Sequence, residues 1–314
     1  MEFLLLLAIP LLGFAFSGSD DHNDDPEPEQ PGDTLSGGES NDTLLGTTGA
    51  DVISGNGGDD SLVGFAGDDT IRGGFGNDIV DGHLGDDYVN GGADDDTVLG
   101  YFGDDTLLGG RGDDVVLGEE GDDSIDLGDG NDTNWVSPEI SQDAFAYGQL
   151  GDDQVFGGAG NDSIWDYAGE NTLDGGDGDD EISATDNQLD GWETADDAAD
   201  QVSGGAGDDV LVGDDGDTLL GGAGDDLMVT VHERDEAEAV TVGDYDGNAD
   251  SLELHVDSAI ADLTQWTLFS QTDTATGNVT LGLENNTDPA QTIELAYLTN
   301  ATNFAIAQVT LIQN

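Results

Sequence analysis

The sequence predicts an all-β protein: a solenoid of short parallel strands built from Gly-rich nonapeptide repeats, followed by an antiparallel β-rich C-terminal cap. Three observations predict it: a nine-residue repeat that runs unbroken from Gly37 to Trp135, one aliphatic residue at a fixed place in each repeat, and alternating apolar segments after Thr230. A short fixed period indicates one small unit stacked on copies of itself, each burying its apolar side chain against its neighbours.

The repeat unit reads Gly-x-x-Gly-x-Asp-x-aliphatic-x, as in Gly55–Val63 and Gly64–Arg72. Of the eleven consecutive units, all have Asp at the sixth position, and all but the last, where Asn134 stands, have an aliphatic residue at the eighth. Three residues around one aliphatic form a very short strand, and the glycines let the backbone turn tightly. Two units then make one flattened coil of 18 residues, with a thin apolar core between two walls of parallel strands.

Such a core is too thin to hold the coil by itself, because each unit buries only one aliphatic side chain and stacking brings acidic side chains together. Like charges in neighbouring turns repel one another, so a cation is required between them. Carboxylates and free turn carbonyls form the hard oxygen cage that suits Ca²⁺, which takes six to eight oxygen ligands. Each ion is expected between turns stacked on the same wall, two nonapeptides apart.

Two units, Gly157–Trp165 and Gly204–Val212, match the pattern Gly-Gly-x-Gly-x-Asp-x-aliphatic-x at every defined position. The repeat resembles the calcium-binding nonapeptide repeats of the RTX (repeats-in-toxin) family. The resemblance implies a parallel β-roll that binds multiple Ca²⁺ ions through the sixth-position aspartates and carbonyls of the Gly-rich turn. The predicted ligands are Asp42, Asp51, Asp60, Asp69, Asp78, Asp87, Asp96, Asp105, Asp114, Asp123, Asp132, Asp153, Asp162, Asp180, Asp209, Asp217 and Asp226.

The charge balance excludes several classes of function. The chain has 3 basic and 72 acidic residues, a net charge of −69, so binding of nucleic acid through its phosphates is excluded as a general mode. It has no cysteine, which excludes disulfides and leaves metal ions to cross-link the fold. The fifth-position acids are expected to be solvated excess charge: Asp59, Asp68, Asp86, Asp104, Asp113 and Asp122.

The first 34 residues contain two different segments. Residues 1–18 include an apolar run, Phe3–Phe16, which is short for a membrane span of about 20 residues and lacks the basic start of a secretory signal. It is either a signal-like leader or a short anchor, and membrane contact is expected only through residues 3–16. Residues 19–34 are acidic and proline-rich, which predicts a disordered linker.

The roll is predicted over residues 35–229, with interruptions at 136–147 and 184–194 that bulge out while the stack continues. Asn171 stands at a sixth position and offers only a neutral oxygen, so its site should be weaker. A degenerate unit carries Asp200, and the unit that carries Asp217 is one residue short between Gly216 and Asp217. Trp135 and Trp165 occupy ninth positions and either pack under the interruptions or form a ligand-binding aromatic surface.

Residues 230–314 lose the period and show alternating apolar segments that read as antiparallel strands. These are Ala239–Val242, Ser251–Val256, Gln265–Phe269, Asn278–Leu283, Thr292–Tyr297 and Phe304–Ile312. They are expected to cap the open end of the roll. Val242–Leu254 resembles the region that follows the roll in many RTX proteins, which implies a C-terminal type I secretion signal and a type I exporter as partner.

No catalytic motif stands out. The sequence has neither His-Glu-x-x-His nor a Gly-x-Ser-x-Gly elbow, so the chain is not expected to be an enzyme. Three hypotheses remain open at this point. The first is an exported, calcium-folded roll with a structural or matrix role, secreted or at the cell surface. The second is a surface-tethered adhesin that uses the roll as a spacer. The third is an enzyme with its site in the interruptions or the C-terminal region.

Overall fold

The computed structural model describes residues 32–134, 151–166, 169–185, 199–232, 239–256, 264–273, 276–287, 291–306 and 309–313. The predicted leader, most of the predicted linker, the interruption 136–147 and Trp135 lie outside these ranges. None of the described segments forms a helix with the length and apolarity that a membrane crossing requires.

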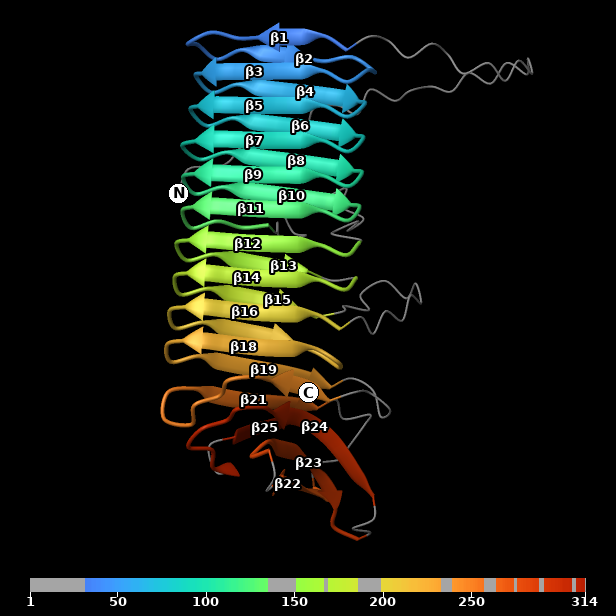
Figure 1. The fold of residues 1–314 in the computed structure, drawn as a ribbon, viewed down its shortest axis with the longest axis vertical. Coiled ribbons are helices and arrows are strands. Elements are labelled where there is room, and N and C mark those ends of the chain that lie inside the picture. The colour runs from blue at the N-terminus through green and yellow to red at the C-terminus, as the bar shows by residue number, and fades with distance from the viewer. Residues whose placement is uncertain are drawn as a thin grey trace, which may run out of the picture.

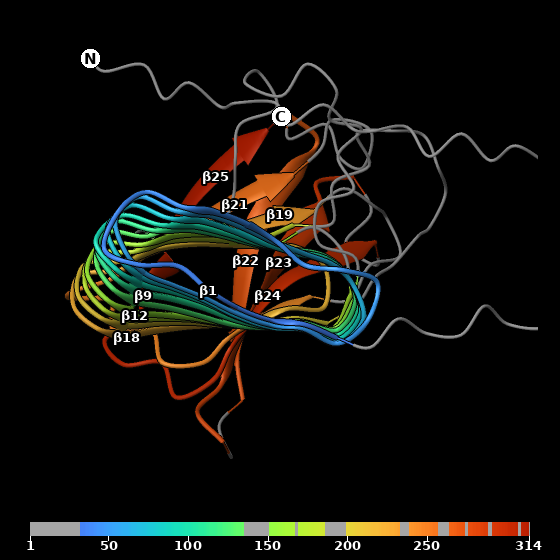
Figure 2. The same cartoon turned by 90° about the horizontal axis from the view of Figure 1, so that it is seen from above.

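The chain winds into a flattened coil whose strands stack along one long axis (Figure 1). Seen down this axis, the coil has two flat walls that lie close together (Figure 2). Along most of the roll successive strands alternate between the walls, so a strand pairs in parallel with the strand two places on, as β3 does with β5. At the first interruption β11 pairs directly with β12. The predicted parallel β-roll is confirmed.

Wall A is the roll part of a 14-stranded sheet, in the order β1-β3-β5-β7-β9-β11-β12-β14-β16-β18-β20, and β24-β23-β22 complete that sheet. Its strands are β1 (Thr34–Ser36), β3 (Val52–Gly57), β5 (Thr70–Phe75), β7 (Tyr88–Ala93), β9 (Thr106–Arg111), β11 (Ser124–Asp129), β12 (Gln154–Ala159), β14 (Thr172–Asp177), β16 (Gln201–Ala206), β18 (Thr218–Ala223), β20 (Val240–Val242), β22 (Trp266–Thr272), β23 (Val279–Asn285) and β24 (Thr292–Leu298).

Wall B consists of a five-stranded sheet and a six-stranded sheet, in the orders β10-β8-β6-β4-β2 and β13-β15-β17-β19-β21-β25. Single bridges from Thr133 to Val115 and to Ser163 join them. The strands are β2 (Thr43–Leu45), β4 (Ser61–Ala66), β6 (Ile79–Leu84), β8 (Thr97–Phe102), β10 (Val115–Glu120), β13 (Ser163–Asp166), β15 (Glu181–Ala184), β17 (Val210–Gly213), β19 (Leu227–His232), β21 (Ser251–Val256) and β25 (Val309–Gln313).

The stack continues through the interruptions, as expected. Most paired residues are 18 apart, but Ser124 pairs with Gln154 across the first interruption and Thr172 with Gln201 across the second. At the shortened unit Gln201 pairs with Thr218. The extra residues therefore leave and rejoin the coil without shifting its register.

The core lies between the walls and is one side chain thick. The eighth-position aliphatic residues from Ile53 to Ile125 are buried to 1% exposure or less, which confirms their predicted role. Asn134 occupies the same position before the first interruption. Its side chain accepts a hydrogen bond from the Trp165 N–H at 2.8 Å and donates one to the Trp165 carbonyl at 3.2 Å. The amide thus replaces a strand partner where the chain leaves the wall.

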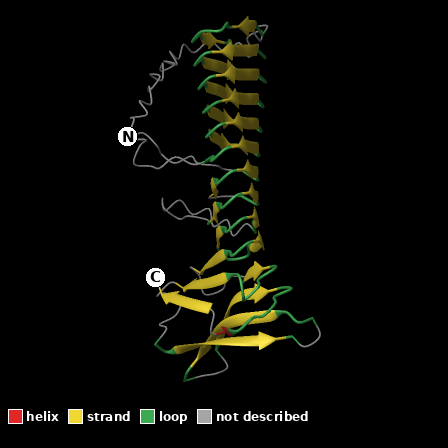
Figure 3. Ribbon diagram, turned by 90° about the vertical axis from the view of Figure 1, so that its left-hand side faces the viewer, coloured by secondary structure: helices red, strands yellow, loops and turns green. Residues whose placement is uncertain are grey.

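The C-terminal segment caps the roll, but its predicted pairing is partly wrong. Strands form at all six expected places, yet only β22, β23 and β24 pair in antiparallel fashion. Strands β20, β21 and β25 instead extend the two walls in parallel, and the antiparallel strands fold across the end of the stack (Figure 3). Parallel growth is favoured because the last coil presents unpaired backbone groups on both walls.

Candidate metal centre

The sixth-position aspartates lie in the turns between the walls, one above another along the stack. Sixteen of the seventeen predicted ligands are exposed by 3% or less, and Asp42 in the first coil is half-buried. The turns of each edge therefore hold a column of buried carboxylates spaced one coil apart.

From Asp51 onwards, one oxygen of each carboxylate accepts a hydrogen bond from the backbone of the preceding coil. The N–H of Asp87 donates to Oδ1 of Asp105 at 2.8 Å, and the N–H of Asp96 donates to Oδ1 of Asp114 at 2.8 Å. The same bond crosses the first interruption, from the N–H of Asp123 to Oδ1 of Asp153 at 2.7 Å. We call this series the inner ladder. It satisfies backbone donors that a turn would otherwise leave unpaired.

The second oxygen, Oδ2, is buried and accepts no hydrogen bond from the described residues at thirteen of these positions. A buried carboxylate oxygen without a donor is costly, so a cation in contact with it would stabilise the turn. The thirteen are Asp60, Asp69, Asp78, Asp87, Asp96, Asp105, Asp114, Asp123, Asp132, Asp153, Asp162, Asp180 and Asp209.

The first-position glycines show where these oxygens point. A Cβ built on Gly91 would lie 2.6 Å from Oδ2 of Asp96 and 2.8 Å from the carbonyl oxygen of Gly109 in the next coil. Glycine is therefore required here for space, because a carboxylate oxygen and a carbonyl oxygen converge on the bare Cα. This convergence of oxygens fits a hard cation such as Ca²⁺.

Backbone carbonyls must supply much of the coordination shell. In the part of the chain that the structure describes, no three acidic or histidine side chains gather as a metal-binding group. An ion held in a turn would thus take one oxygen from each aspartate nearby and complete its shell with turn carbonyls such as that of Gly109. This donor set is all oxygen, as Ca²⁺ prefers.

Burial strongly disfavours ionisation of these aspartates in the metal-free chain. Desolvation raises the pKa of Asp96 and Asp105 to about 8, and that of Asp87 and Asp132 to about 7; nearby carboxylates add to the rise, and the inner-ladder hydrogen bond opposes it. A bound divalent cation would reverse this preference by favouring the charged form.

We expect the metal-free roll to become more stable as the pH falls from about 8 towards 4. The pKa values of the folded chain lie above the ordinary 3.8, so between these values the folded state binds more protons than the unfolded state, and its stability decreases as the pH rises. Far-UV circular dichroism in EDTA at several pH values tests this, with strand content expected to increase as the pH falls. With Ca²⁺ present the trend should invert, because protons compete with the ion. A metal-free roll that gains stability with rising pH would contradict the assignment.

Asp217 departs from the pattern. Its Oδ1 accepts the N–H of Asp200 at 2.9 Å, and its Oδ2 accepts the N–H of Asp214 at 2.8 Å. A Cβ on Gly213 would meet the Leu219 side chain at 2.8 Å, with no backbone carbonyl among its nearest atoms. Both oxygens are used because the shortened unit draws the turn inward, so Asp217 lacks the free Oδ2 of the thirteen positions above, and its role as a metal ligand stays a prediction.

Asn171 and Asp200 complete the inner ladder across the second interruption. Asn171 accepts the N–H of Asp153 at 2.9 Å, and its Nδ2 donates to the Gly169 carbonyl at 3.1 Å, so a neutral amide occupies the place of a free oxygen. Asp200, which the predicted ligand set omits, accepts the N–H of Asn171 at 2.7 Å and is buried. The sequence indicated this position through Val202, two residues on, which occupies the core position of a unit that lacks its glycines.

The expectation that the fifth-position acids are only solvated charge is incomplete. These residues are exposed, but they accept hydrogen bonds from the following coil. The N–H of Asp104 donates to Oδ1 of Asp86 at 3.1 Å, and the N–H of Asp122 donates to Oδ1 of Asp104 at 3.1 Å. This outer ladder runs in the opposite direction to the inner one, and it gives the surface acids a structural role.

The comparisons with known proteins agree with this geometry. A family model described as the RTX calcium-binding nonapeptide repeat, in four copies, matches residues 36–64, 63–98, 99–133, 147–182 and 194–228, which is more than half of the chain. No curated protein matches the chain. The matched segments contain all seventeen predicted ligands and both ladders over most of their length.

Proposed function

The chain belongs to the RTX family of calcium-binding nonapeptide-repeat proteins, and from this premise we propose that it is exported unfolded and folds on Ca²⁺ outside the cell. There it would act as a structural or matrix component. Its binding of calcium through a β-roll follows from the family. Its export, its location outside the cell and its role there are the proposal.

The observation that carries the proposal is the array of thirteen buried Oδ2 atoms without hydrogen-bond donors among the described residues. Without a cation the carboxylates repel one another and oppose stacking of the coils. Low-affinity extracellular sites have dissociation constants of about 10⁻⁴–10⁻³ M, so cytosolic Ca²⁺ leaves them vacant and extracellular Ca²⁺ fills them. The fold then depends on the compartment.

We further propose that the protein is not an enzyme. The described arrangement most similar to a catalytic triad is His232, whose Nδ1 lies 2.6 Å from Oδ1 of Asp215 and whose Nε2 lies 3.3 Å from Oγ1 of Thr230. Thr230 is fully buried and His232 nearly so, which leaves no room for a substrate at the hydroxyl. The trio supports a structural reading: it fixes the turn of the shortened unit onto β19.

Export is tested with two truncations expressed beside a type I exporter. Deletion of the last sixty or so residues should abolish secretion, because a type I signal is expected in the C-terminal segment. Deletion of residues 1–18 should leave secretion intact. The culture medium is assayed for the protein, and the cell extract serves as the control for expression. Loss of secretion only in the N-terminal deletion would show that the chain uses the general pathway and that this proposal is wrong.

A further inference from the structure

The second position of the repeat differs sharply between the two walls. On wall A it is glycine in four successive coils, with φ between +113° and +128°: Gly74, Gly92, Gly110 and Gly128. On wall B the same position carries Phe65, His83, Tyr101 and Glu119, at φ between +81° and +86°. Side chains rarely adopt this left-handed backbone. Because wall A forms the same coil with glycine, the fold does not require the bulky residues.

These four wall-B residues, which we call the ridge, form a continuous column on the outer face. The rings of Phe65 and His83 are stacked with centroids 5.9 Å apart, and those of His83 and Tyr101 with centroids 5.1 Å apart. Leu84 and Phe102, in the next position along β6 and β8, are both well exposed. The three rings of the ridge, together with Leu84 and Phe102, therefore form an aromatic and aliphatic patch that ends at Glu119, on a chain with 72 acidic residues.

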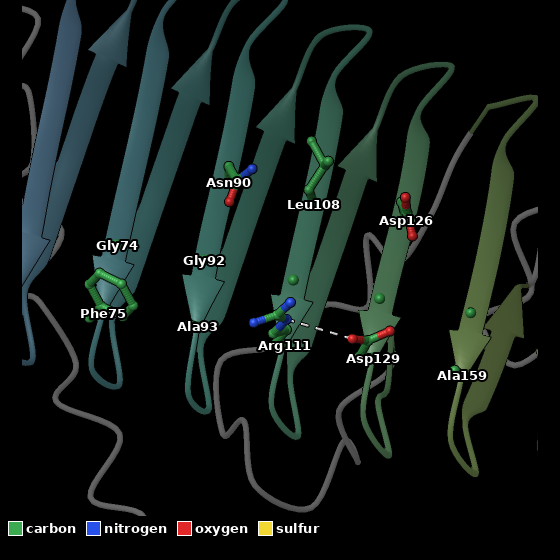
Figure 4. Close-up of a pocket in the computed structure, with 13 residues that line it drawn as sticks. Gly74, Phe75, Asn90, Gly92, Ala93, Leu108, Arg111, Asp126, Asp129 and Ala159 are labelled. Atoms are coloured by element: carbon green, nitrogen blue, oxygen red, sulfur yellow. Dashed lines mark ion pairs between the residues drawn. The ribbon is translucent and has the colours of Figure 1, made fainter.

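The glycine column of wall A forms the floor of a groove of about 660 Å³ (Figure 4). Phe75 and Arg111 stand on one side of the floor, and Asn90, Leu108 and Asp126 on the other. Phe75 is 72% exposed, so its ring is largely in contact with water. The groove runs across β5, β7, β9, β11 and β12, along the axis of the roll.

The two faces offer one complementary charge pair, Arg111 of the groove and Glu119 of the ridge, although Asp126 and Asp129 also line the groove. Both described arginines lie on wall A: Arg72 over the ring of Tyr88, at 5.3 Å from its centroid, and Arg111 beside the groove. Arg111 is 3.7 Å from Asp129, and both side chains are largely exposed, so this pair is weak and easily exchanged. The ridge ends in Glu119 and lies beside Asp81, which is 7% exposed with an Oδ1 that accepts no hydrogen bond from the described residues.

We propose that rolls associate face to face, with the ridge of one copy seated in the groove of a second copy. Successive residues of the ridge and of the groove have the same spacing along the axis, because successive coils lie one strand spacing of about 4.8 Å apart. Their side chains therefore stay in register. The register that places Glu119 opposite Arg111 also places Tyr101 opposite Gly92 and His83 opposite Gly74. The inference deepens the proposed matrix role and rests on the calcium-folded roll.

Because ridge and groove lie on opposite walls (Figure 2), the contact is heterologous and does not close. Each copy that accepts a ridge still presents its own ridge to the next. The expected assembly is an open stack of rolls rather than a dimer. Self-repulsion of the acidic surfaces opposes this at low ionic strength, so assembly should strengthen as salt screens the long-range charge.

Sedimentation velocity of the full calcium-loaded chain tests the proposal, in moderate salt and over a range of protein concentrations. The wild type should form species larger than a dimer. Two ridge substitutions, His83→Gly and Tyr101→Gly, should weaken association at least about tenfold when combined, and they suit the left-handed backbone, so the fold is retained. Leu220→Ser is the matched control, since this wall-A residue is 40% exposed and lies outside the groove.

A charge exchange tests the pairing itself. Arg111→Glu alone should weaken association, and adding Glu119→Arg should restore it. Far-UV circular dichroism in Ca²⁺ is recorded for every variant, so failure to fold, which bears on the proposed function, is separated from failure to associate. A wild type that stays monomeric, association that persists in the ridge variants, or a charge exchange that restores nothing would each overturn the proposal.

Discussion

Removal of calcium is expected to abolish the strand structure of the roll at neutral pH. Thirteen buried carboxylate oxygens then lack any partner in the described chain, and each coil adds one further charge to the column of like charges at each edge. Far-UV circular dichroism in EDTA should show a largely disordered chain, and Ca²⁺ at millimolar concentration should restore β-structure. The expected change is the largest available for this protein, because it concerns every coil at once.

The transition should be cooperative in Ca²⁺, since each site joins oxygens from neighbouring coils and one filled site orders the next. Mg²⁺ is the control: it holds its water tightly and demands a stricter octahedral geometry, so at the same concentration it should restore much less structure. Native-like strand content in EDTA at neutral pH would show that the roll does not depend on the metal.

Asp105→Asn is expected to have opposite effects with and without calcium. An asparagine retains Oδ1, so the N–H of Asp87 keeps its acceptor at the inner ladder, but the free carboxylate oxygen is lost. In Ca²⁺ the midpoint concentration for folding should rise roughly two- to tenfold. In EDTA the stability should increase, because a buried carboxyl whose pKa is raised to about 8 is replaced by a neutral group. Asn171 shows that the turn accepts an amide.

Two variants isolate the cause. Asp104→Asn removes the same charge from the neighbouring residue, which is exposed and belongs to the outer ladder, and it should change the Ca²⁺ midpoint little. Asp105→Ala removes both oxygens and should be less stable in EDTA than Asp105→Asn, by about 1–3 kcal/mol for the donor left unpaired. Calcium titrations followed by circular dichroism compare the three. Equal midpoints for Asp105→Asn and Asp104→Asn would contradict the assignment of the sixth position.

The repeat itself could be predicted because its signals are local. An aliphatic residue every nine positions places the core, and aspartate at a fixed offset places the turns. The ladders could not be predicted in this way, since the direction of a bond such as that from Asp87 to Asp105 depends on how far one coil is displaced over the next. The same limit applies to Asp217, where a single missing residue redirects the turn so that a backbone N–H reaches Oδ2.

The cap shows a second limit. Segments such as Ser251–Val256 alternate apolar and polar residues, and alternation predicts a strand without stating its partner. β21 pairs in parallel with β19 because the last coil offers its edge there, which is a property of the folded roll and not of the segment. The sequence likewise shows that the second position alternates between glycine and larger residues. Only the backbone angles show that the larger residues adopt a left-handed conformation on wall B.

The direction of the inner ladder gives folding of the roll a preferred starting end. Each N–H of the ladder donates to a side-chain oxygen one coil closer to the C-terminus. Along one edge the series ends in the cap, where Asp250 accepts the N–H of Asp226, and along the other it ends at Asp217, which accepts the N–H of Asp200. Asp244 of the cap also accepts the N–H groups of Gly221 and Gly222. A coil that docks on the N-terminal side of an ordered stack finds its acceptors already fixed, whereas one that docks on the other side leaves its own donors exposed. Nucleation at the cap and growth towards the N-terminus is thus the route whose intermediates leave the fewest backbone N–H donors unpaired. The cap acts as a template for the first coil.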